Sequence, residues 1–158
     1  MTLSNALAPY LTIRDAIITL LKANLTVVNT DLTYSVVITN IDKGDPTVEP
    51  VPLTRVPCIF VRFDGKPEEQ FLASQRKGAR IIYRIFGITR RVGKVGPADD
   101  EMTTLARNIE SIFRNNINIS NNVLLCNPSS LELGIGIGDN KSFISVSTLT
   151  LEAEINIS

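Results

Sequence analysis

Apolar residues recur at helical spacing in two segments of the chain. In residues 13–24 they share one side of a helix, and charged residues fall on the other side. Thr12 is placed to cap this helix, with Asp15 three positions later as in a capping box. A longer apolar stripe runs through residues 99–116 and consists of Met102, Leu105, Ala106, Ile109, Ile112 and Phe113. The spacing predicts two amphipathic helices, the second beginning at the acidic residues 99–101, where the helix dipole favours negative charge.

Alternation of apolar and polar residues predicts the strands of the domain. These strands are 34–40, 58–65, 79–91, 123–126, 131–137 and 142–158. A turn is expected at residues 127–130, because they read Asn-Pro-Ser-Ser. In the last strand Ile144 and Val146 fall on the opposite parity from the apolar positions after residue 148. We therefore expect a bulge or bend near Ser147.

Two long loops are predicted between the strands. Residues 41–57 hold four of the eight prolines, and residues 65–78 are polar and bounded by glycines. Phe71 and Leu72 lie in the middle of the second loop. They either pack back onto the core of the chain or serve as anchors for a partner.

The order of these elements predicts an α+β fold. We expect a mostly antiparallel sheet with two helices packed on one face, and a C-terminal β-hairpin. At 158 residues the chain is long enough for one domain with a single core, so residues 1–158 are taken as one unit.

The strand at 79–91 has one face that suits a core and one face of mixed character. The odd-numbered face offers Ala79, Ile81, Tyr83 and Ile85 to the core. The even-numbered face, here called the mixed face, consists of Arg80, Ile82, Arg84, Phe86, Ile88 and Arg90. Leaving its large apolar side chains in water costs about 1.5–3 kcal/mol each. Either the proline-rich loop or a second subunit must cover them, and the sequence favours a second subunit.

The charges support self-association. The chain has no net charge, but residues 76–94 hold seven basic groups and no acid. Acidic residues come late in the chain, and Glu152 and Glu154 fall on the outward parity of the last strand. A chain with a basic and an acidic surface suits head-to-tail contacts between copies, with arginines such as Arg84 meeting those acids. The alternative is that both sets of charges are solvated on separate surfaces.

Composition excludes several kinds of chemistry. Histidine is absent, which removes histidine-based nucleophile systems and the usual zinc sites. Cys58 and Cys126 lie in apolar strands and are expected to be buried thiols. We expect no enzyme activity and no cofactor. The weaker enzyme hypothesis is a divalent-metal cluster built from Asp64, Glu68 and Glu69 or from Asp99, Asp100 and Glu101.

A third hypothesis is a nucleic-acid-binding module. It would use Arg80, Arg84, Arg90 and Arg91, with Tyr83 and Phe86 as stacking platforms. No apolar run reaches the roughly 20 residues of a membrane-spanning helix, so no membrane partner is expected.

The order and size of the elements resemble the tail terminator, or tail completion, proteins of tailed bacteriophages and related prophages. The similarity runs through "TIRDAIITLLKANL", "VPCIFVRFDG", "ARIIYRIFGITRR" directly before "DDEMTTLARNIESIFRNN", and the final "STLTLEAEINIS". Members of this family are small α+β domains that form hexameric rings. Such a ring caps the tail tube and offers a surface to the head and neck proteins.

The resemblance implies a virion protein assembled in the host cytoplasm, with itself, the tail tube and the neck proteins as partners. The mixed face, with Arg91 beside it, would then lie at subunit contacts or along the ring lumen through which DNA passes. The loop at 41–57 is longer than the family pattern, so it is a candidate contact for a tube, sheath or neck protein. The same departure leaves open whether the chain is a terminator or a related neck component.

Overall fold

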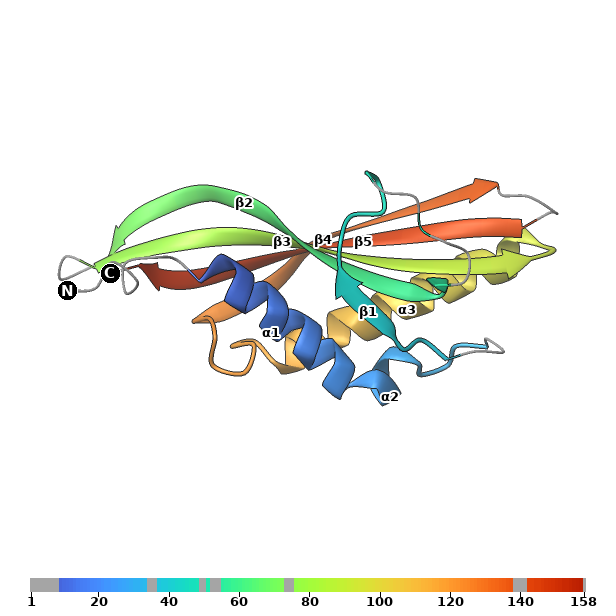
Figure 1. The fold of residues 1–158 in the computed structure, drawn as a ribbon, viewed down its shortest axis with the longest axis horizontal. Coiled ribbons are helices and arrows are strands. Elements are labelled where there is room, and N and C mark those ends of the chain that lie inside the picture. Colours follow the sequence, from blue (N-terminus) through green and yellow to red (C-terminus); the bar gives the residue numbers. More distant parts are fainter. Residues whose placement is uncertain are drawn as a thin grey trace.

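The chain folds into one curved sheet with its helices gathered on one face, as the computed structural model in Figure 1 shows. The structure describes residues 9–33, 37–48, 51, 55–72, 76–137 and 142–157, without the side chains of 68–72, 76, 77 and 157. The helices are α1 (Tyr10–Ala23), α2 (Leu25–Val28) and α3 (Val95–Asn115). The strands are β1 (Asn40–Lys43), β2 (Cys58–Leu72), β3 (Arg76–Val92), β4 (Leu125–Ile137) and β5 (Ser142–Ile157).

The strands lie in the order β1-β2-β3-β5-β4. Strand β1 runs parallel to β2, and every other neighbouring pair is antiparallel. Strands β4 and β5 form the C-terminal hairpin. The predicted α+β class, with a mostly antiparallel sheet and helices on one face, is confirmed.

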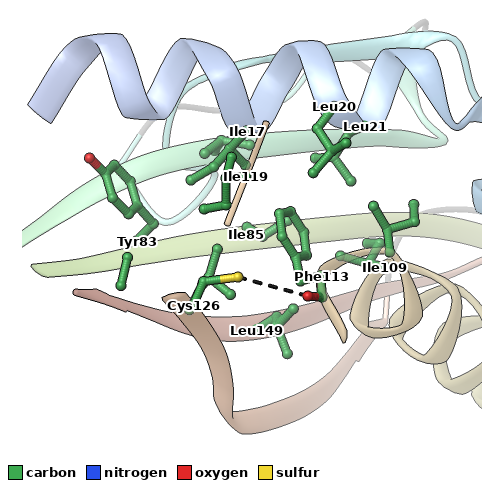
Figure 2. Close-up of a cluster of buried hydrophobic side chains, with 14 of the residues drawn as sticks. Ile17, Leu20, Leu21, Tyr83, Ile85, Ile109, Phe113, Ile119, Cys126 and Leu149 are labelled. Atoms are coloured by element: carbon green, nitrogen blue, oxygen red, sulfur yellow. Dashed lines mark hydrogen bonds between the residues drawn. The ribbon is translucent and has the colours of Figure 1, made fainter. Parts of the chain in front are cut away.

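The core lies between the helices and the odd-numbered face of β3. Ile81, Tyr83 and Ile85 are fully buried there, against Ile17 of α1 and Phe113 of α3 (Figure 2). The Tyr83 hydroxyl donates a hydrogen bond of 2.6 Å to the Tyr10 carbonyl, which ties the start of α1 to the centre of the sheet. The expected core face of this strand is therefore confirmed.

Small side chains let α3 pack close to β3 and β5. A Cβ at Gly87 would lie 2.9 Å from Leu105 Cδ2 and 2.7 Å from Ser147 Oγ, so a larger residue there requires one of these side chains to shift. Ser145 and Ser147 are buried on the same face of β5. The pairing of β3 with β5 runs through Ser147 without a register shift. Of the bulge or bend expected near Ser147, the bulge is wrong, because a small buried serine keeps the strand in register beneath the helix.

The first strand begins later in the sequence than the alternation predicted. Residues 37–39 are not in the sheet, residues 34–36 lie outside the described part, and β1 begins only at Asn40. The Asn29 side chain explains the later start of the strand, since it accepts a hydrogen bond from the Ile38 amide and donates one to the Ile38 carbonyl. A side chain thus takes the place of a strand neighbour before the sheet begins. The proline-rich loop consequently starts after Lys43 and not at residue 41.

The prediction of a second loop at residues 65–78 is wrong. Strand β2 continues to Leu72 and β3 begins at Arg76, and the two pair as a long antiparallel ribbon. Two register shifts, between Phe63 and Gly65 and between Gly65 and Glu68, absorb the residues that do not suit a regular strand. Gly65 takes a positive φ of 114°, which glycine adopts without strain.

Helix ends and one turn also differ from expectation. Helix α1 begins at Tyr10, so Thr12 lies inside it and is no cap. Helix α3 begins at Val95, which puts the acidic residues 99–101 in its second turn and leaves no acid in the first. The predicted turn at 127–130 is a register shift between Pro128 and Ser130 within a continuous β4.

Candidate subunit interface

The mixed face of β3 lies on the side of the sheet away from the helices. Arg80, Ile82, Arg84 and Arg90 are half-buried there. Phe86 and Ile88 are only 3% and 2% exposed within a single chain. These two side chains therefore need no second subunit to cover them, which corrects the expectation from the sequence.

Cross-strand neighbours and the proline-rich loop cover the apolar part of the mixed face. Phe86 lies between Phe60 and Thr148 in the register of the sheet. After β1 the chain rises past β2 to the side away from the helices (Figure 1). There the Gly44 amide donates to the Val61 carbonyl, and Gly44 lies against the Phe60 ring. The first residues of the loop that the sequence offered as an alternative cover thus lie over Phe60, the cross-strand neighbour of Phe86.

An ion pair holds that loop in place. Arg62 of β2 donates a short hydrogen bond to Asp45, which also accepts bonds from the Thr47 amide and hydroxyl. Burial alone would raise the pKa of Asp45. The hydrogen bonds from Thr47 and the Arg62 guanidinium outweigh it and hold the pKa below the ordinary value.

Several arginines of the predicted interface find acids within their own chain. Arg84 Nε lies 2.7 Å from Asp64 Oδ2, and Arg80 Nη1 lies 3.7 Å from Glu152 Oε2. The Asp64 carboxylate raises the pKa of Arg84 above its ordinary value. The expected pairing with Glu152 therefore occurs inside one subunit, whereas Glu154 is exposed. Among the described side chains, none forms an ion pair with Arg90.

Arg91 belongs to the helix side of the sheet. Its Nη1 lies 2.8 Å from Oε1 of Glu101, a buried carboxylate on α3 that also accepts a hydrogen bond from the Thr33 hydroxyl. This pair ties α3 to β3, so Arg91 is a packing residue of the subunit. The side chains of Phe71 and Leu72, the remaining predicted anchors, lie outside those that the structure describes.

An apolar stripe on β4 was not identified as a surface from the sequence. Leu131, Leu133 and Ile137 are 38%, 44% and 86% exposed, and Ile135 is half-buried. All four share the parity of Leu149, Ser147 and Ser145 on β5 and so lie on the helix side of the sheet. Their alternation predicts a strand correctly, but a strand pattern cannot show whether a helix reaches far enough to cover it. We call residues 131–137 of β4 the β4 stripe.

Of the two hypothetical metal clusters, the one at residues 99–101 is not assembled. Glu101 points to Arg91, while Asp99 and Asp100 are exposed, and Asp64 pairs with Arg84. Within the described ranges, no three acidic or cysteine side chains form a group that could hold a metal ion. The side chains of Glu68 and Glu69 lie outside those ranges.

The two cysteines are free and buried, as expected from their apolar contexts. Burial raises the pKa of both Cys58 and Cys126 to about 11, so few of either thiol are ionised near neutral pH. Cys126 Sγ lies 3.8 Å from the Phe113 carbonyl oxygen (Figure 2). Both residues therefore act as core side chains.

No helix in the described part of the chain has the length and apolar content needed to cross a membrane. No protein-family model matches the chain, and no curated protein matches it in sequence.

Proposed function

We propose that the chain is a structural subunit of a tailed bacteriophage, acting as a tail terminator. In this proposal copies of the chain form a hexameric ring that caps the tail tube and joins it to the neck and head. The resemblance in element order suggests this role. The observation that carries it is the β4 stripe, an apolar surface on an open sheet edge that the described chain leaves exposed.

A subunit of this kind acts by binding other proteins, so its working parts are surfaces. The half-buried arginines of the mixed face and the β4 stripe are the two candidates on this chain. The loop after β1 is a third candidate contact, toward tube, sheath or neck, because Thr47 and Val48 at its start are exposed. DNA would only pass through the ring, and the protein would reside in the virion after assembly in the host cytoplasm.

The pairing of the arginines favours this role over nucleic-acid binding. Arg80, Arg84 and Arg91 each have a carboxylate partner, which reduces the positive potential that phosphate would meet. Tyr83 is fully buried, so it is no stacking platform for a base.

Antibody labelling of virus particles tests the proposed function directly. Particles released by the organism that encodes the chain are incubated with gold-labelled antibody against it and imaged in negative stain. We expect label at the junction of head and tail. Preimmune serum is the control, and particles that carry no label, or carry it only at the distal tip, would contradict the proposal.

A further inference from the structure

The two outer edges of the sheet are built differently. Beyond the four residues of β1, the edge formed by β2 carries Arg62, Lys66 and Pro67 and two register shifts. Charge, proline and bulges are the features that keep a sheet edge from pairing with another strand. The edge formed by the β4 stripe has one charge, no proline and an unbroken register after Ser130. As far as the two edges are described, the second is the better suited to accept a strand.

We propose that the β4 stripe pairs antiparallel with the β4 stripe of a second copy, about a two-fold axis at Gly134. In this register Leu133 lies opposite Ile135 of the other copy, and Leu131 lies opposite its Ile137. Glu132 lies opposite Gly136. The two sheets then join into one continuous sheet with the helices of both copies on the same side.

The sequence of β4 is complementary to itself in this arrangement. Every large apolar side chain meets another on the helix side of the sheet, which removes the exposed stripe from water. The single charge meets a glycine, so no like charges come together. Centring the pair on Glu132 would place the two carboxylates side by side, and centring it on Leu133 or Ile135 would leave one end of the stripe unpaired.

The size of the contact sets the expected strength. A pair of seven-residue strands buries less than the roughly 800 Å² per partner of a standard interface. We therefore expect a dimer with a dissociation constant in the range of about 1–100 µM. A two-fold contact closes on itself, so it yields pairs and no ring. If the proposed function is correct, the pair must separate before the ring forms.

Engineered cysteines test the register. Gly134 lies on the proposed axis, and a Cβ there meets nothing within 4 Å, so Gly134→Cys is accommodated. Its Cα would face its own copy at about 4.5–5.5 Å, which suits a disulfide. Gly136→Cys is the matched control, because its Cβ is also tolerated but its two copies would lie about 13 Å apart. Both native cysteines are buried.

We expect oxidised glutathione to convert Gly134→Cys to a covalent dimer at least about tenfold faster than Gly136→Cys. Sedimentation from about 1 to 500 µM should show a reversible dimer of the unmodified chain. Ile135→Lys should weaken that dimer at least about tenfold, since lysine is a natural guard of sheet edges. Ile117→Lys, at a side chain 56% exposed outside the strands, should leave it unchanged, and circular dichroism should show both variants folded.

Three results would overturn the inference: a monomer at all concentrations, equal crosslinking of the two cysteine variants, or a dimer that Ile135→Lys leaves intact. Rings formed by Gly134→Cys chains whose unassembled fraction yields no crosslinked dimer would support the proposed function and contradict the pairing. A crosslinked dimer that forms no rings, together with virus particles that carry no label, would support the pairing and contradict the proposed function.

Discussion

At the scale of single residues, Gly87 shows how closely α3 approaches the sheet. It lies in the middle of a strand, where glycine weakens the backbone, yet any side chain there would meet Leu105 and Ser147. Ser147 is buried beside this contact, at a position where alternation suggests a larger residue. Close packing of a helix on a sheet therefore explains two positions that strand propensity does not.

We expect Gly87→Ala to lower the free energy of unfolding by about 1–3 kcal/mol, because the added methyl forces Leu105 or Ser147 to move. Urea denaturation followed by circular dichroism measures the change. Gly134→Ala is the control and should alter stability by less than about 1 kcal/mol, since no atom lies near its Cβ. Equal stability of the two variants would show that α3 packs less closely than described.

At the scale of elements, the loop after β1 covers Phe60 and so protects the apolar part of the mixed face. The Asp45–Arg62 pair holds this loop at its start. The sequence identified the loop by its prolines but could not decide where it lies, because proline fixes local dihedral angles and not the path of a segment across a sheet. Phe86 and Ile88 are buried among the neighbouring strands of the same chain.

We expect Asp45→Asn to destabilise the chain by about 1 kcal/mol near neutral pH, a small value because Arg62 is 47% exposed. The pKa of Asp45 in the folded chain lies below its ordinary value of 3.8. The stabilisation is therefore complete above about pH 5 and is lost as the pH falls through the folded pKa. Chemical denaturation of both proteins at several pH values should show their difference vanish in acid.

Hydrogen exchange of residues 44–48 provides a second measure, because loss of the pair should speed exchange in this loop while β3 stays protected. The control is Arg14→Ala, which removes an ion pair with an exposed partner on α1 and should not affect the loop. A constant difference in stability down to pH 2 would contradict the assignment.

At the scale of the whole molecule, two candidate contact surfaces are the β4 stripe and the half-buried arginines of the mixed face. The stripe suits pairing of two copies, and the arginines remain candidates for the contact that closes a ring. Arg84 and Arg80 are already held by acids of their own chain. Arg90 is therefore the better position at which to test the ring contact.

We expect Arg90→Glu to prevent ring formation while leaving the subunit folded, because a like-charge contact between copies costs more than loss of a surface pair. Negative-stain imaging and sedimentation measure assembly, and circular dichroism measures folding. Arg107→Glu, on an arginine whose side chain is 60% exposed on α3, is the control. Normal rings from Arg90→Glu would remove the mixed face from the subunit contact.

The sequence by itself determined the fold class, the two long helices, the core face of β3 and the C-terminal hairpin. These follow from periodicity, because burial of one side of each element imposes a repeat that is visible in the chain. The ends of the elements did not follow from periodicity. The long β2–β3 ribbon replaced a predicted loop because cross-strand hydrogen bonds and bulges held polar residues in a strand.

Only the tertiary structure decided which surfaces remain exposed. Periodicity shows that a face is apolar, but what covers it depends on the path of distant segments. Phe86 and Ile88 of the mixed face looked uncovered in the sequence and are buried within a single chain. The β4 stripe follows the alternation of an ordinary strand, and it is exposed at the edge of the sheet.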